Sequence, residues 1–251
     1  MSDDADPQDY SSMKGVADEP HWNAFVPTVG GQLVAPLIKR QGVKNADYLF
    51  PAARVVAELK VLETEFAHTP EMLAKVDHVA AKYPGEHPDD PTTPLRGELI
   101  KLLRAPLQRI INKANRQIKE TKQELGLVGW RGILIIVNDS FRGLPPGMVM
   151  GLIANVLAGQ SYSSTDAFIY QTNHCVELPD NPYAVYLWAP LYSDRATDDL
   201  VEFINNLGRS WRNYFEAIAG PFDYSAEQES ADLANALVVT GPFRHRRYDG
   251  D

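Results

Sequence analysis

The stretch ADYLFPAARVVAELK, residues 46–60, decides the fold expected of this chain. It falls within two runs, residues 45–50 and 54–62, that are rich in the β-branched and aromatic residues typical of strands. Pro51 stands between the runs, where a proline interrupts the hydrogen bonding of a strand. The stretch therefore predicts two strands that are joined by a tight link and pair side by side.

Three charged residues fall inside this otherwise apolar pair of strands. Because side chains alternate along a strand, Glu58 and Lys60 point to the same face. Pairing of the two strands brings Asp47 beside Glu58, and buried charges are unfavourable unless they are paired or bind a metal ion. The carboxylates of Asp47 and Glu58, with the backbone carbonyl of Leu59, suit Mg²⁺ or Mn²⁺. Lys60 would then orient or activate a water molecule.

The pattern Glu-x-Lys is a weak signal by itself. Glu120-Thr121-Lys122 repeats it in a segment that we expect to be helical. A glutamate and a lysine on one strand face also form exposed ion pairs at sheet edges. The sequence leaves both interpretations open, and the apolar flanks of Glu58 with the aspartate upstream favour the metal site.

A long amphipathic helix is predicted to begin near Pro106, after a short helix at 95–104. Its apolar residues recur at steps of three or four and form one stripe. Seven basic residues and one acidic residue lie between positions 101 and 122. Such a face either is merely solvated or contacts the phosphates of a nucleic acid. The candidates for phosphate contacts are Arg109, Lys113, Arg116 and Lys119.

The other segments alternate between helical and strand patterns. Residues 132–139 (GILIIVND) are apolar on both faces, as in a covered strand of a parallel sheet. This order predicts a mixed α/β fold in which helices cover a central sheet. Further strands are expected at 166–172 and 184–189, and further helices at 32–42, 71–83, 147–158, 198–219 (with an aspartate cap) and 225–237.

The strand pair resembles the active-site signature of the PD-(D/E)XK nuclease superfamily. Asp47 matches the first acid of that signature, Glu58 the second acid and Lys60 the lysine, although Ala46 stands where the motif has its proline. The resemblance implies a restriction-endonuclease-like fold and metal-dependent cleavage of nucleic acids.

The resemblance extends over roughly residues 30–140, the expected nuclease-like core, and includes the basic helix and the strand after it. Gln117 resembles the helix glutamine of the RecB-type subgroup, and Thr121 stands where that subgroup usually has a tyrosine. Cores of this superfamily usually begin with a helix and three strands. The sequence indicates only two clear strands before the long helix, and residues 21–27 or 62–67 are the candidates for the third.

Composition places the chain among ordinary globular proteins. It has 251 residues, of which 44% are hydrophobic and 23% charged, which excludes coiled-coil, collagen-like and wholly disordered classes. The formal charge of −9 argues against general binding to polyanions. The single cysteine, Cys175, excludes an internal disulfide and a cysteine-rich zinc site. The acidic start lacks the features of a signal peptide, and no apolar run suits a membrane span, so we expect a cytoplasmic protein without membrane contact.

The expected organisation is an acidic, disordered tail over residues 1–20 and a single α/β domain over residues 21–251, in which residues 141–251 extend the sheet of the nuclease-like core. The leading hypothesis is a Mg²⁺- or Mn²⁺-dependent nuclease that acts on nucleic acid, with DNA as the expected substrate. The open alternative is a catalytically inactive protein of the same fold that binds a protein or a nucleic acid. A homodimer is compatible with either. The residues assigned to the catalytic site are Asp47, Glu58, Lys60 and Gln117.

Overall fold

A computed structural model describes residues 8–179, 181–228 and 231–243, and these form an α/β protein around a mixed six-stranded sheet. The strand order in the sheet is β2-β3-β4-β5-β6-β9. β4, β5 and β6 run parallel, and β2, β3 and β9 join antiparallel at the two sides. The bounds are β2 Gln32–Leu33, β3 Tyr48–Phe50, β4 Val55–Leu62, β5 Arg131–Asn138, β6 Ala167–Thr172 and β9 Trp188–Tyr192.

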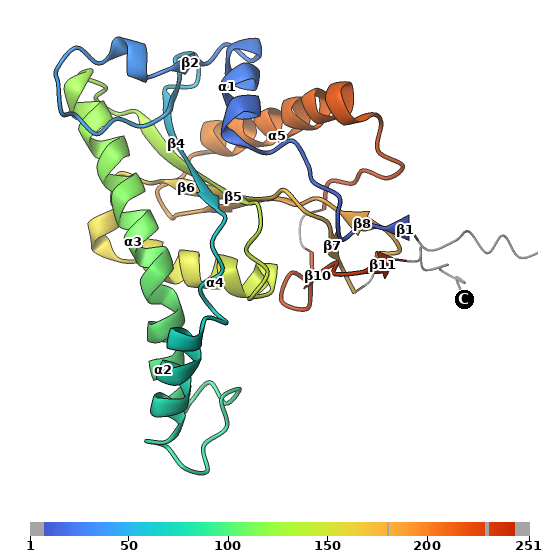
Figure 1. Ribbon diagram of the computed structural model, residues 1–251. Helices are drawn as coiled ribbons and strands as arrows, with labels where there is room; N and C mark the ends of the chain where they lie inside the picture. Colours follow the sequence, from blue (N-terminus) through green and yellow to red (C-terminus); the bar gives the residue numbers. More distant parts are fainter. Residues whose placement is uncertain (1–7, 180, 229–230, 244–251) are drawn as a thin grey trace, which may run out of the picture.

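Helices cover both faces of this sheet (Figure 1). α3 and α4 bury Ile111 and Ile153 against Leu134 and Ile136 of β5 on one face. α1 and α5 cover the other face. The indole rings of Trp22 in α1 and Trp211 in α5 stack there, with ring centroids 4.5 Å apart. The helix bounds are α1 Glu19–Thr28, α2 Pro70–Ala80, α3 Pro94–Glu124, α4 Pro146–Leu157 and α5 Asp198–Ala219, with 3₁₀ turns η1 at Ala35–Leu37 and η2 at Gln160–Tyr162.

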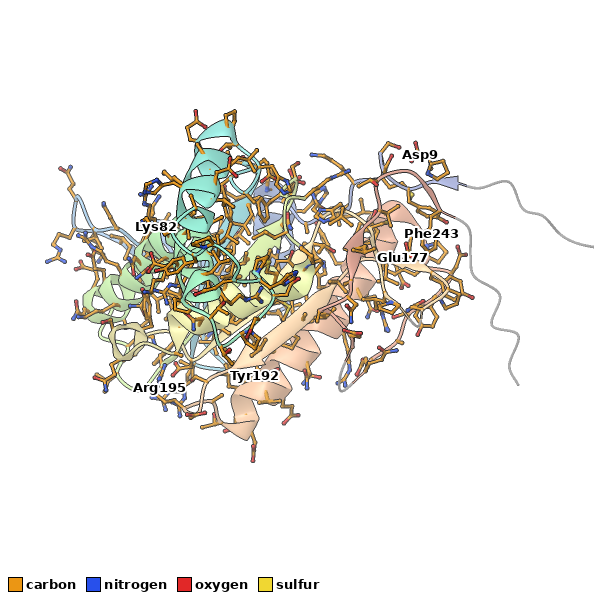
Figure 2. The ribbon with its side chains drawn as sticks, turned by 90° about the horizontal axis from the view of Figure 1, so that it is seen from below. Asp9, Lys82, Glu177, Tyr192, Arg195 and Phe243 are labelled. Atoms are coloured by element: carbon orange, nitrogen blue, oxygen red, sulfur yellow. The ribbon has the colours of Figure 1, made fainter. Side chains whose placement is uncertain are left out.

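Short strands form two small antiparallel sheets at one end of the molecule, where Figure 2 shows Asp9, Glu177 and Phe243 together. Elsewhere on the molecule, α2 and the first half of α3 project from the body as a helical pair, at the bottom of Figure 1. None of the helices in the described part of the chain is long and apolar enough to cross a membrane. The small sheets contain β1 (Gln8–Asp9) with β11 (Pro242–Phe243), and β7 (Val176–Glu177) with β8 (Ala184–Val185) and β10 (Leu237–Val238).

The hairpin and the parallel core confirm the central expectations. β3 and β4 pair antiparallel from Phe50↔Val55 to Tyr48↔Ala57. β5 is buried from Gly132 to Asn138, because parallel neighbours flank it and helices cover both of its faces. The helices expected at 71–83, 147–158 and 198–219 are present as α2, α4 and α5.

The helix expected at 32–42 is wrong, because this segment holds β2 and the turn η1. β2 pairs with β3 through Leu33↔Tyr48, so tertiary pairing overrides the local helical pattern. β2 is the third strand before the long helix. Residues 21–27 lie in α1, and residues 62–67 add no further strand beyond the last residue of β4.

Pro106 does not separate two helices. α3 runs without a break through this residue over 31 residues, about 46 Å at 1.5 Å per residue. Buried residues on both sides of the proline, Leu95 and Leu107, keep the helix continuous although the proline lacks an N–H to donate.

Three expectations for the second half also change. The strand expected at 184–189 is two strands, β8 and β9. α5 is capped by Thr197, with no side-chain hydrogen bond, and not by an aspartate. The helix expected at 225–237 is absent from the described residues of that range, and β10 begins at Leu237 because it pairs with β7.

The expected acidic tail is described from residue 8 onward, and that part packs against the body. Gln8 pairs with Phe243, and the Gly15 N–H donates to the Asn173 carbonyl at 2.9 Å. Val16 and Ala17 are buried. Residues 1–7 and the basic end at 244–251 lie outside the described residues.

Candidate metal centre

Asp47 immediately precedes β3, at the point where β3 stops covering the edge of β4. The Asp47 N–H donates to the Ala57 carbonyl at 3.2 Å, which closes the hairpin pairing. Beyond that point the Asp47 side chain takes the place of a strand partner for β4, because its Oδ2 accepts the hydrogen bond of the Leu59 N–H at 2.7 Å. The hairpin therefore holds this carboxylate against the part of the β4 edge that β3 leaves unpaired.

Glu58 and Lys60 lie on the same face of β4, as their spacing predicts, and this face is the one covered by α3. Their strand partners are Leu134 and Ile136, which belong to the core beneath α3 and α4. The side chain of Glu58 has no exposed surface, and Lys60 is 18% exposed. Lys60 Nζ donates to Glu58 Oε1. Glu58 is therefore a buried carboxyl group and not part of a solvent-exposed edge.

Burial is the main influence on both carboxyl groups. It raises the pKa of Glu58 to about 8, and the negative charge of Asp47 adds to this increase while Lys60 opposes it. Burial also raises the pKa of Asp47, where the hydrogen bond from Leu59 and the charge of Lys60 act in the opposite direction. Two neighbouring acids with raised pKa values are typical of a site that holds a cation or carries out proton transfer.

A pocket of about 280 Å³ opens beside this pair of acids, and it adds two carboxylates that the sequence did not indicate. Glu19 and Glu63 line it, and Glu19 is close enough to raise the pKa of Asp47. Glu19 stands at the start of α1, where Asp18 accepts the His21 N–H at 2.9 Å. The run Asp-Glu-Pro at 18–20 was the available signal, because it combines a capping residue with a proline in the first turn.

α3 fixes the segment that leads into Asp47. Gln117 Nε2 donates to the Asn45 carbonyl at 2.8 Å, and the Ala46 N–H donates to Thr121 Oγ1 at 2.7 Å. Gln117 Oε1 is buried without a hydrogen-bond partner. Gln117 therefore reaches the strand pair, as its place at the edge of the apolar stripe predicts, and it contacts the backbone next to Asp47.

The oxygen atoms present at this edge fit a hard divalent cation. Glu58 Oε2 is buried and has no hydrogen-bond partner, and Asp47 Oδ1 is not the oxygen that Leu59 holds. The Leu59 carbonyl lies on the same edge as its N–H, because the two groups of a strand residue face the same neighbour. Among the residues that the structure describes, no three Asp, Glu, His or Cys side chains are close enough to form a complete metal site. The protein offers two carboxylates and a carbonyl, and Mg²⁺ characteristically keeps several waters.

The four basic candidates on α3 are all exposed, but they do not share one flank of the helix. Gln117 faces the strand pair, whereas Asn115 contacts the Ser161 carbonyl and Thr165 near η2 on the far flank. At about 100° per residue, Lys119 falls on the flank of Asn115. Lys113 and Arg109 lie nearer to the flank of Gln117, whereas Arg116 lies midway between the two flanks and is paired with Glu120.

Three other titratable groups, Cys175, His174 and Asp139, are buried or held by hydrogen bonds and ion pairs. Cys175 is buried, and burial raises the pKa of its thiol. His174 is also buried, which lowers its pKa to about 4. Asp139, at the end of β5, is paired with Lys14 at 3.2 Å and accepts from Asn173 Nδ2 at 2.7 Å.

Comparison of the chain with known proteins finds no match among family models, curated proteins or solved structures.

Proposed function

We propose that the protein is a metal-dependent phosphodiesterase that cleaves nucleic acid, with DNA as its expected substrate. The observation that carries the proposal is a pair of carboxyl groups, the buried Glu58 and the half-buried Asp47, with Lys60 beside them, at a sheet edge that opens into a pocket. A fully buried glutamate beside a second acid is costly for a protein that does not use it.

The order of elements supports the resemblance to the PD-(D/E)XK superfamily. From α1 onward the chain runs α1, β2, β3, β4, α2, α3, β5, with the turn η1 between β2 and β3, and a helix followed by three strands is how cores of that superfamily begin. The acids and the lysine lie at the start of the second strand and on the third. Because the chain has no match among known proteins, this support comes from topology and from the site alone.

Asp47, Glu58 and the Leu59 carbonyl would hold Mg²⁺ or Mn²⁺, which supplies an acidified water and neutralises charge on a phosphate group. Asp47 is already oriented by its hydrogen bond from Leu59. Lys60 keeps Glu58 Oε1 in place and carries a positive charge beside the pocket, where it can orient a nucleophilic water or stabilise a negatively charged transition state. Gln117 positions the backbone that leads into Asp47.

The test is Mg²⁺ and Mn²⁺ binding by calorimetry, followed by cleavage of labelled DNA and RNA. We expect the wild type to bind a divalent ion and to cut, and Glu58→Gln and Lys60→Ala to lose cleavage. Glu98→Gln is the matched control, because Glu98 is a partly exposed residue of α3 that lies outside the site and pairs with Lys101. Absence of metal binding in the wild type would refute the proposal.

The alternative, a catalytically inactive protein of the same fold, is favoured by one observation, the lack of a third acidic or histidine ligand among the described residues. Under that alternative, substitution of Glu58 or Lys60 leaves every binding activity of the protein unchanged.

A further inference from the structure

A basic loop lies shortly before Asp47 in the chain. It comprises residues 39–44 (KRQGVK), between η1 and β3, and it turns at Gly42, whose φ of +79° favours glycine. Figure 1 shows the chain passing from η1 across the end of α3 that leads to β5. Lys39, Arg40 and Lys44 are all exposed.

The last turns of α3 anchor this loop through acidic side chains. Glu124 pairs with Arg40 at 3.0 Å, and Glu120 accepts the Lys44 N–H at 3.2 Å. Glu120 also pairs with Arg116. These contacts neutralise Arg40 and Arg116 and fix the backbone of the loop, so the loop has a defined position beside α3.

Three ammonium groups on this side of the molecule remain available. The side chains of Lys39, Lys44 and Lys113 form no ion pair with any described residue. Lys113 lies one helical turn before Gln117, which is bonded to Asn45, so it is on the flank of α3 that faces the start of β3. Lys119 is on the opposite flank.

The pocket itself cannot attract a polyanion, because Glu19, Asp47 and Glu63 line it with a single lysine. Phosphate groups must therefore be held by positive charge next to the pocket. Lys44 is three residues from Asp47 along the chain, and Lys113 is one turn from the helix residue that fixes the same segment. Because the overall charge is −9, such a local concentration of unpaired lysines is a favourable approach for a polyanion on this side of the described structure.

We propose that the basic loop and Lys113 bind the phosphate backbone of a nucleic acid and deliver it to the pocket, and that the Lys119 flank of α3 takes no part. The inference rests on the proposed function in taking the polyanion to be the substrate. It narrows the contact surface from the whole basic face of α3 to the side that adjoins β3.

The test measures binding of fluorescein-labelled single-stranded DNA, duplex DNA and RNA by fluorescence anisotropy, in EDTA and over a series of KCl concentrations. The variants are Lys39→Ala/Lys44→Ala, Lys113→Ala and, as the matched control on the same helix, Lys119→Ala. Each lost phosphate contact flattens the slope of log K against log salt by about 0.7–0.9. We expect a change of about 1.4–1.8 for the double variant, about 0.7–0.9 for Lys113→Ala and none for Lys119→Ala.

The inference is overturned if the double variant keeps the wild-type slope, if Lys119→Ala weakens binding as much as Lys113→Ala does, or if the wild type binds none of the three probes. Mg²⁺ calorimetry on the same variants separates this result from the proposed function. Unchanged Mg²⁺ binding with altered nucleic-acid binding supports the loop. Nucleic-acid binding through the loop without any Mg²⁺ binding would refute the phosphodiesterase and leave the loop assignment intact.

Discussion

The substitution Glu58→Gln distinguishes two effects of the buried Glu58 carboxylate: the stability that the protein loses by burying its charge, and the stability that it gains when the carboxylate binds Mg²⁺. Burial raises the pKa of Glu58 from 4.5 to about 8, so the folded protein holds this proton more tightly than the unfolded chain does. Between these two pH values the folded state binds more protons, and the free energy of unfolding falls by about 1.4 kcal/mol per pH unit. From pH 4.5 to pH 7 the loss from this group is on the order of 3 kcal/mol.

A glutamine at this position has no proton to lose. We therefore expect metal-free Glu58→Gln to resemble the wild type near pH 4.5, and to become more stable than the wild type by about 3 kcal/mol as the pH reaches 7. Saturating Mg²⁺ should reverse the order. At a thousand times its Kd it stabilises the wild type by about 4.1 kcal/mol, which exceeds the difference of about 3 kcal/mol, and it has no complete site in the variant.

The assay is urea denaturation followed by circular dichroism, at pH values from 4.5 to 8, once in EDTA and once in Mg²⁺. Glu98→Gln serves as the control, because Glu98 lies in α3 outside the site and pairs with Lys101. Parallel pH profiles of the wild type and Glu58→Gln in EDTA would refute the reasoning, because they would show that Glu58 does not carry a raised pKa in the folded protein.

Three further predictions concern the residues that position Asp47 and hold the helices against the sheet. Gln117→Ala removes the donor to the Asn45 carbonyl, so we expect weaker Mg²⁺ binding by calorimetry and a stability loss of about 0.5–1.5 kcal/mol; unchanged Mg²⁺ affinity would rule out a positioning role. Trp22→Ala leaves a cavity beside Trp211 and should destabilise the protein by about 3–5 kcal/mol in urea, and a loss below 1 kcal/mol would contradict the stacked core. Pro106→Ala restores a helix N–H and should raise the free energy of unfolding by on the order of 1–3 kcal/mol, and the melting temperature with it. A lower melting temperature would indicate that α3 needs the proline.

The sequence predicted the parts of the fold that local pattern controls. The hairpin followed from two β-branched runs around Pro51, and the shared face of Glu58 and Lys60 followed from the period of a strand. β5 was recognisable because it is apolar on both faces. These signals need no knowledge of distant residues.

The sequence did not predict the parts that distant contacts control. β2 has only two residues, and both are exposed, so no hydrophobic pattern in the sequence indicates that this segment pairs with β3. α3 continues through Pro106 because buried residues on either side hold it. Glu19 reaches the pocket only because α1 packs against Tyr48 and Phe50 of β3 on one face of the sheet, which residue spacing does not reveal.

The contacts between α3 and the segment before Asp47 also set the order in which the chain can complete this site during synthesis. β3 and β4 are neighbours in sequence, so the hairpin can pair as soon as residue 62 is available. Asn45, however, is held by Gln117, which is 72 residues further along the chain. Such long-range closure is entropically demanding and comes late. A nascent chain that ends before α3 is complete would contain Asp47 and Glu58 but would lack the contacts from α3 that fix the segment before Asp47. The metal site would therefore form only after α3 has been synthesised.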